Sequence, residues 1–212
     1  MTNSFIIDPA LPVRPAMLDG MQREWDRLAA AGTWWTGADR VALAAEARAA
    51  ADHRPSPASV LAPEITAMAR RIATTPHVID RTSVDALHDQ KVSLEAYTEM
   101  VGVIARLTAV DTAVRGMGSS PAPLPKPQEG VPTYAVVPDA KRRSAHVAMV
   151  GSAGATSALS SVAAEDSAQQ DLHGALYLSY SEMGDYRIVK DIPRWQMELA
   201  AATTSWLNHC VY

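Results

Sequence analysis

Apolar residues recur at steps of three and four over most of this chain, which is the pattern of helices that bury one face. The first run follows Pro15 and stops before Gly32. The second follows Thr36, a residue type that caps helix starts, and is broken near Pro55. We predict one helix in each of these two segments.

Five further helices are predicted by the same rules. Proline suits the first turn of a helix because its missing N–H would have no partner there, so Pro63 opens the third helix, which Pro76 closes. Thr82 or Ser83 caps a short helix that runs through Leu87. The remaining helices are expected after Ser93, from 164 to about 183, and from 194 to about 207.

The segment between these groups of helices cannot itself be helical. Six prolines fall between 116 and 144, and proline lacks the amide hydrogen that a helix interior needs and favours extended geometry. Small residues follow at 150–154. We therefore divide the chain into a helical unit at 1–118, a proline- and glycine-rich linker at 119–154 and a second helical unit at 155–212.

Composition supports an all-α fold. Alanine is abundant and phenylalanine occurs once, which favours closely packed helices over a sheet of β-branched residues. The formal net charge of −4 gives no basic field for nucleic acid or an anionic membrane surface. No apolar run is long enough for a membrane span, and no signal-peptide pattern opens the chain, so a cytoplasmic location is expected.

Two parts of the chain resemble each other. Moving the sequence by 156 positions aligns 41–45 with 197–201 and 52–54 with 208–210, so that a Leu, two Ala and a His coincide. A repeat of this kind predicts two related helical units. Two alanine-rich helices can also match through composition alone.

The candidate chemistry lies near the end of the chain. Cys210 is the single cysteine, so it cannot form an internal disulfide, and Glu198 precedes it by twelve positions. His209 stands directly before the thiol. A cationic imidazole can lower the pKa of a neighbouring cysteine, so His209 is a third candidate catalytic residue.

The stretch from Gln196 to Tyr212 resembles the alkylhydroperoxidase D-like or carboxymuconolactone decarboxylase family, in which a Glu is followed about eleven residues later by Asn-x-Cys-x-x-Cys and then a His. Glu198, Asn208 and Cys210 fit this spacing. The resemblance implies a helical bundle of two related alkylhydroperoxidase-like units. It also implies reduction of hydroperoxides by a thiol or selenol, with Cys210 in the redox pair and Glu198 as proton relay.

The chain departs from the family pattern in two places. The second redox residue would fall one position beyond Tyr212 and the trailing His is absent, so the second unit is expected to be truncated. In some relatives that position is selenocysteine, and the natural product is then expected to continue past Tyr212. The corresponding stretch of the first unit, 52–57, has no cysteine, so that unit is expected to be inactive. Cys210 alone would need an external thiol to reduce its oxidised form.

Two other functions compete with the peroxidase. One is a non-catalytic helical scaffold for dimerisation or ligand binding, in which Cys210 is a packed small side chain and Glu198 a solvated helix residue. The other is a lactone decarboxylase of the same family. The expected partners are a small-molecule peroxide, a thiol reductant and further copies of the chain, because an incomplete unit leaves apolar helix faces exposed. Neither a cofactor nor a metal is expected, since the sequence has no phosphate-binding loop and no zinc-ligand spacing.

The other aromatic residues are interpreted as structural. His173 and Tyr177, one helical turn apart, are expected to form a surface pair. The remaining side chains expected to be buried are Trp34, Trp35 and Trp206 as core anchors, and Met197, Leu199, Ala200 and Leu207 in the last helix.

Overall fold

The computed structural model describes residues 4–57, 60–152 and 154–208, and within them the fold is mostly helical, as predicted. The α-helices are α1 (Pro15–Ala29), α2 (Gly37–Ala51), α3 (Pro63–Thr74), α4 (Arg81–Asp89), α5 (Leu94–Gly116), α6 (Ala163–Leu176) and α7 (Arg194–Leu207). No helix in this described part is both long and apolar enough to cross a membrane.

The helix starts follow local capping chemistry. Thr36 caps α2 in a reciprocal capping box with Asp39, and the Ser93 hydroxyl accepts a hydrogen bond from the amide of Ala96 at the start of α5, as the sequence predicted. The predicted cap of α4 was wrong. The Asp80 carboxylate caps this helix by accepting from the amide of Ser83 at 2.8 Å, because a carboxylate at this position also favours the positive end of the helix dipole.

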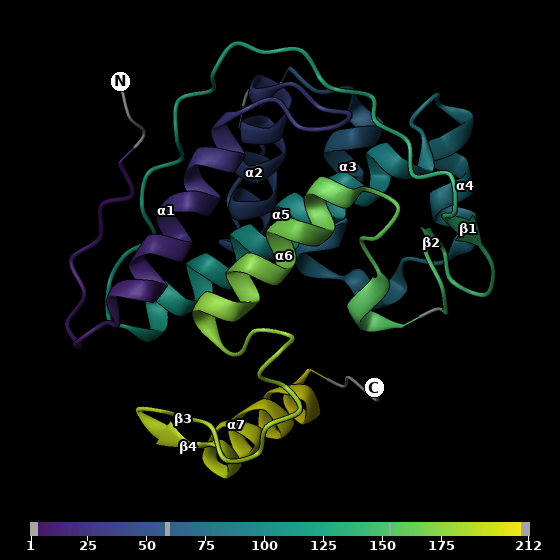
Figure 1. Cartoon of the computed structure of the whole chain (residues 1–212). Coiled ribbons are helices and arrows are strands. Elements are labelled where there is room, and N and C mark those ends of the chain that lie inside the picture. The colour runs from purple at the N-terminus through teal and green to yellow at the C-terminus, as the bar shows by residue number, and fades with distance from the viewer. Residues whose placement is uncertain (1–3, 58–59, 153, 209–212) are drawn as a thin grey trace.

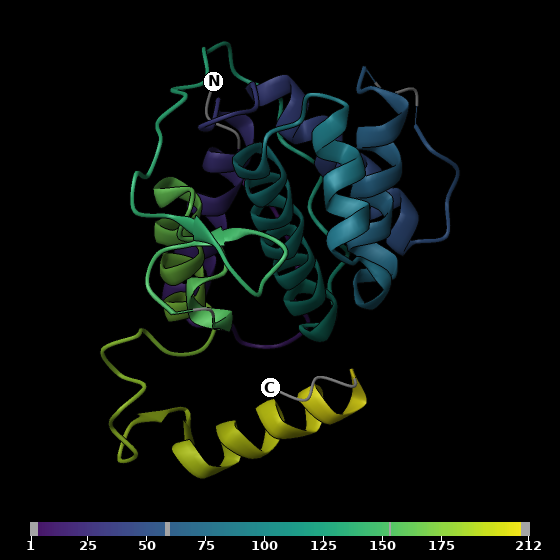
Figure 2. The ribbon, with the colours of Figure 1, turned by 90° about the vertical axis from the view of Figure 1, so that its right-hand side faces the viewer.

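Helix α5 forms the centre of the core. Helices α1, α2, α3, α4 and α6 all contact it, and Figure 2 shows α1 and α6 on one side of it and α3 and α4 on the other. Its buried apolar residues recur at helical spacing and pack against Trp25 and Leu43 of the neighbouring helices. The fully buried apolar residues of α5 are Met100, Val103, Ile104, Leu107, Val110 and Val114.

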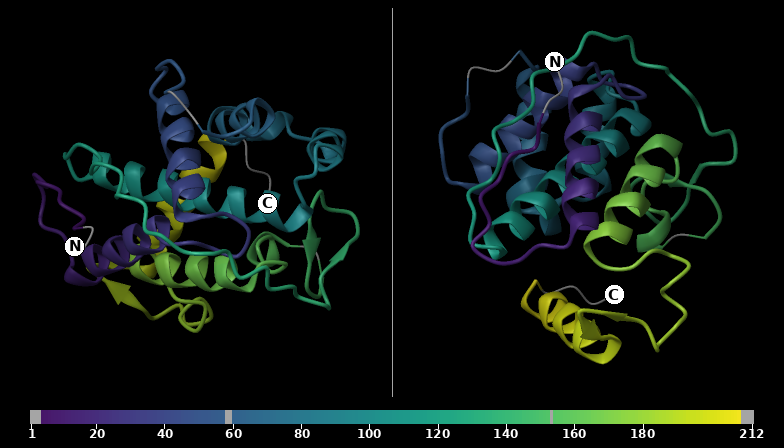
Figure 3. Two further views of the ribbon diagram at one scale, coloured as in Figure 1. Left: turned by 90° about the horizontal axis from the view of Figure 1, so that it is seen from above. Right: turned by 60° about the vertical axis from the view of Figure 1, so that its left-hand side comes forward.

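The proline-rich segment after α5 is extended and lies against the bundle. The indole N–H of Trp25 donates to the carbonyl of Pro123 at 2.9 Å, and the amides of Gln128 and Tyr134 donate to the end of α1 and the loop after it. Figure 3 shows this segment running over the outside of the helices. The prolines therefore favour an extended strap whose few free amides bond to the α1–α2 region.

Two short hairpins and two 3₁₀ turns in the described part of the chain were not predicted. Strands β1 (Lys141–Arg142) and β2 (Ala148–Met149) pair antiparallel, as do β3 (Val189–Lys190) and β4 (Ile192–Pro193). The 3₁₀ turns are η1 (Pro76–Val78) and η2 (Ala155–Ser157). Strands of two residues are too short to show an alternating pattern, so periodicity could not find them.

Helix α6 ends at Leu176 and not near residue 183, so the predicted extension was wrong. The backbone leaves the helix at Tyr177, with φ −135° and ψ −93°. The turn that follows is held by side chains, since the Glu182 carboxylate accepts from the Ser179 amide at 2.7 Å and the Leu178 carbonyl lies 2.5 Å from His173 Nδ1. These local bonds compete with continuation of the helix.

Helix α7 lies outside the bundle in Figures 1 to 3. An ion pair of 3.1 Å between Arg14 and Asp191 ties the β3–β4 turn to the start of α1. Of the α7 residues expected to be buried, Met197 is buried, whereas Leu199 and Trp206 are 62% and 77% exposed. Ala200 and Leu207 are also exposed, because no described element covers that face.

Candidate functional site

Of the three candidate catalytic residues, Glu198 is described, while His209 and Cys210 lie outside the described residues. Glu198 is in the second turn of α7, and its side chain is 45% exposed. The carboxylate forms a small cluster with Tyr177 and Arg194, which we name the Glu198 cluster. Tyr177 is the residue at the end of α6. The chain after it folds back, so that α7 lies against Tyr177.

Both partners of Glu198 bind the same carboxylate oxygen. The Tyr177 hydroxyl donates to Glu198 Oε1 at 2.6 Å, and Arg194 Nε donates to the same atom at 2.5 Å. The second oxygen, Oε2, accepts no hydrogen bond from a described residue. The carboxylate is thus held in position while one oxygen stays available to another donor.

The partners also set the charge of the cluster. The Tyr177 hydroxyl, and then Arg194, hold the pKa of Glu198 below its usual value, so this carboxylate is ionised at neutral pH. Burial, and then the bond to Glu198, raise the pKa of Tyr177 to about 12, so the phenol keeps its proton. The arrangement is an anchored base beside a neutral hydrogen-bond donor.

Sequence reasoning found Glu198 through its spacing from Cys210 but gave Tyr177 and Arg194 no role. It did predict a pair between His173 and Tyr177, and the rings are in edge contact with centroids 5.4 Å apart. Arg194 was overlooked although it stands one helical turn before Glu198, a spacing at which opposite charges meet. The guanidinium is nearly buried and also donates to the carbonyls of Glu182 and Met183.

A second cluster, which sequence reasoning missed entirely, lies inside the bundle. Five charged side chains from four helices meet there, and each is at most 3% exposed. They are Glu24 of α1, Arg40 of α2, Glu99 and Arg106 of α5, and Glu165 of α6. We name this group the buried ion network.

The network alternates in charge along its length. Arg106 binds Glu24 at 2.7 Å through Nε and Glu165 at 2.5 Å through Nη2. Glu165 also accepts from Arg40 at 2.9 Å, and Arg40 in turn pairs with Glu99. This series of ion pairs ends at Glu99, whose carboxylate accepts a hydrogen bond from the backbone amide of Trp34 at 2.6 Å.

The network holds three carboxylates and two guanidinium groups. Burial raises the pKa of Glu99, and the nearby Glu165 adds to this while Arg40 opposes it. Burial also acts to raise the pKa of Glu165, but Arg106 and Arg40 outweigh it, and the net shift is downward. Glu99 therefore holds a proton more readily than Glu165.

Two glycines make room for the network. A Cβ atom at Gly32 would collide with the Glu99 carboxylate, and one at Gly102 would collide with Oε2 of Glu165. The signal in the sequence was the presence of Glu99 and Arg106, seven positions apart, among the apolar residues of 97–110. A charge on such a face needs a charged partner from another helix.

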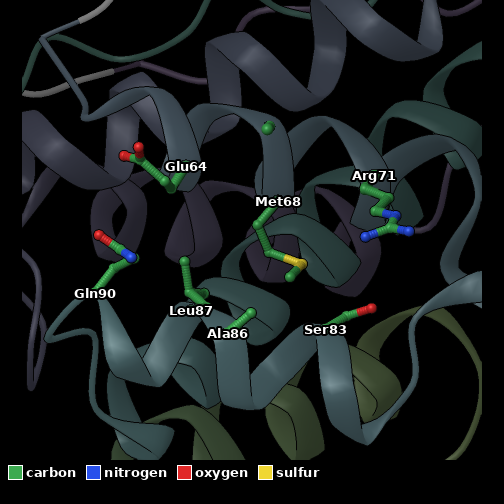
Figure 4. A pocket seen from close by; sticks show the side chains of 8 residues that line it. Glu64, Met68, Arg71, Ser83, Ala86, Leu87 and Gln90 are labelled. Carbon is green, nitrogen blue, oxygen red and sulfur yellow. The ribbon is translucent and has the colours of Figure 1, made fainter.

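An open cavity of about 270 Å³ lies between α3 and α4. Figure 4 shows Arg71 and Ser83 at one end of it and Glu64 and Gln90 at the other, with Met68 between them. Arg71 and Glu64 are exposed, so the cavity has an apolar floor and a polar rim. Nothing in the sequence pattern pointed to it, because its walls come from two separate helices.

Within the described residues, no group of three or more His, Cys, Asp or Glu side chains is placed to hold a metal ion. No protein-family model, no curated protein and no solved structure matches this chain.

Proposed function

We propose that this protein reduces hydroperoxides with Cys210 as the reacting thiol and Glu198 as the group that moves the proton. The observation that carries the proposal is the Glu198 cluster: an ionised, anchored and partly exposed carboxylate twelve residues before the single cysteine. Two donors on one oxygen fix the orientation of the carboxylate and leave its other oxygen available to accept a proton. General bases are held in position in this way.

The proposed reaction balances with one peroxide and two external thiols. The Cys210 thiol gives its proton to Glu198, and the thiolate attacks a peroxide oxygen. The O–O bond breaks, the leaving alkoxide takes the proton to form an alcohol, and the cysteine becomes a sulfenic acid. One external thiol then forms a mixed disulfide and releases water, and a second thiol displaces it to restore Cys210.

The helix bounds support the proposed pair of related units. A shift of 156 positions carries α2 (Gly37–Ala51) onto 193–207, which differs from α7 (Arg194–Leu207) by one residue at its start. The same shift carries α1 onto 171–185, where α6 ends early, so the correspondence covers one helix of the unit.

The same alignment supports self-association. Leu43 of α2 is fully buried, and its counterpart Leu199 of α7 is 62% exposed. Trp195, Leu199, Ala202 and Trp206 stand at intervals of four, three and four, which places them on one exposed stripe of α7. We propose that this stripe packs against a second copy of the chain, since apolar helix faces of this kind are usually covered.

The function is tested by consumption of tert-butyl hydroperoxide in the presence of dithiothreitol. Cys210→Ser is expected to abolish turnover above the rate of dithiothreitol alone. Glu198→Gln is expected to lower it about a hundredfold, the lower range for loss of a general base. Glu129→Gln, which changes an exposed carboxylate of the proline-rich segment, is the control and is expected to keep the wild-type rate.

Two results would support other functions. Absence of turnover together with an ordinary thiol pKa for Cys210 would favour the dimerisation scaffold, which the exposed stripe on α7 also fits. Lactone decarboxylation that persists in Cys210→Ser would favour the decarboxylase.

A further inference from the structure

A second cavity, of about 210 Å³, lies between the first half of α5, the β1–β2 loop and the residues after η2. Its walls are mostly apolar. Val101 of α5 faces this space together with Val147, Met149 and Leu159 from the opposite side. Tyr97 lines the cavity from α5, and His146 is an exposed residue of its rim.

Tyr97 carries an unused polar group in this wall. The side chain is 6% exposed, and its hydroxyl, which bonds to no described residue, is not among the fully buried polar atoms, so it keeps contact with open space. Burial raises the pKa of Tyr97, so the phenol is a neutral donor. The neighbouring Thr98 hydroxyl is satisfied, because it donates to the Leu94 carbonyl at 2.9 Å and accepts from Ser161 at 3.3 Å. The Tyr97 hydroxyl is therefore available to donate a hydrogen bond to a ligand oxygen in the cavity.

The cavity is formed before any ligand binds. Arg81 at the start of α4 donates to the carbonyls of Arg143 and Ala145, at 2.6 and 2.8 Å, and Arg142 pairs with Asp85. These contacts hold the β1–β2 hairpin against α4, where Figure 1 shows it. A preformed wall lowers the entropic cost of binding.

We propose that this cavity binds a neutral small molecule that has one ring, or a short alkyl chain, and one oxygen that accepts a hydrogen bond from Tyr97. A dry cavity of about 150 Å³ is enough for benzene, so 210 Å³ has room for a single ring with a short substituent. The lining residues include no carboxylate and no guanidinium, so an ion would lose its hydration without gaining a partner. This site is separate from the Glu198 cluster and does not depend on the proposed peroxidase.

Acetophenone and cumene test the assignment, because the two probes have the same number of non-hydrogen atoms in the same connectivity and only acetophenone carries an oxygen. Titration of the full chain, followed by amide chemical shifts, is expected to move residues 97–101 and 145–159 with both probes, and acetophenone is expected to bind more tightly. Tyr97→Phe is expected to weaken acetophenone about fivefold to tenfold, the size of one net hydrogen bond, and to leave cumene unchanged. Tyr134→Phe, which removes an exposed hydroxyl elsewhere, is the control and is expected to change neither affinity.

The site is also tested by filling it. Val101→Trp places an indole in the cavity and is expected to abolish shifts with both probes, with the folded state checked by thermal unfolding. The proposal is overturned if acetophenone produces no shifts around the cavity, or if Tyr97→Phe binds both probes with wild-type affinity. The Tyr97→Phe result decides the question even if Val101→Trp does not fold.

Discussion

Glu165 is the residue on which the interior of the bundle depends most. Its carboxylate binds both Arg106 and Arg40, so removing it leaves two buried guanidinium groups short of a partner. We expect Glu165→Ala to lower the free energy of unfolding by about 3–5 kcal/mol, measured by urea denaturation. Arg115→Ala breaks an exposed pair with Asp52 and is expected to cost less than about 1 kcal/mol. Equal losses of unfolding free energy in the two variants would show that the buried ion network does not hold α6 against the other helices.

Asp171 gives the protein a defined acid sensitivity. Hydrogen bonds from Arg23, then the effect of Arg27, lower the pKa of this carboxyl from 3.8 to about 2 in the folded chain. A lowered folded-state pKa means that Asp171 stabilises the protein above its unfolded pKa and loses this contribution as the pH falls from about 4 to about 2. Asp171→Asn should therefore show a smaller loss of unfolding free energy across this interval.

Urea denaturation at a series of pH values measures this slope. Asp89→Asn, at the exposed end of α4, is the control and should keep the wild-type dependence. If the wild type and Asp171→Asn lose stability in parallel between pH 4 and pH 2, the arginine contacts do not set the acid limit.

Two glycines of α5 allow the effect of side-chain packing on stability to be measured separately from the effect of helix propensity. Alanine at Gly102 would collide with the Glu165 carboxylate, which is fixed by two arginines and cannot move aside. We expect Gly102→Ala to destabilise the protein by about 1–3 kcal/mol. Gly116 has no atom within 4 Å of an added Cβ, so Gly116→Ala is expected to stabilise it by about 0.5 kcal/mol. Thermal unfolding of both variants measures the difference, and a loss of stability at Gly116 would contradict this account.

The helices could be predicted from the sequence because their signals are local. Thr36, Ser93 and the prolines at 15 and 63 mark helix starts through bonds within a few residues. The early end of α6 could not be predicted in this way, because it depends on the turn between Ser179 and Glu182 as much as on the helix itself.

The same difference between local and distant signals applies to the two charged clusters. Glu198 was found through a spacing along the chain, whereas Tyr177 reaches it from another helix. The longest direct bond of the buried ion network joins residues 125 positions apart, and one sequence does not show which helices will meet. The exposed face of α7 was predicted to be buried because an apolar stripe on a helix is usually covered. The stripe does not indicate which element, or which other molecule, covers it.

The exposed apolar stripe of α7 predicts that the whole protein self-associates. Leu199→Glu and Trp206→Glu place charges on it and are expected to shift the sedimenting species toward the monomer, because a buried unpaired carboxylate is costly in an interface. Val131→Glu changes an equally exposed apolar residue outside α7 and should leave the assembly unchanged. A wild-type chain that sediments as a monomer at all concentrations would remove the proposal.

The central claim is that Glu198 assists a reaction of Cys210 with peroxide, and the most direct measurement is the loss of the single thiol on mixing with stoichiometric tert-butyl hydroperoxide and no reductant. We expect the wild-type thiol to react faster than free cysteine at the same pH, and Glu198→Gln to react about a hundredfold more slowly than the wild type. Equal rates in the wild type and Glu198→Gln, at the level of free cysteine, would contradict the account.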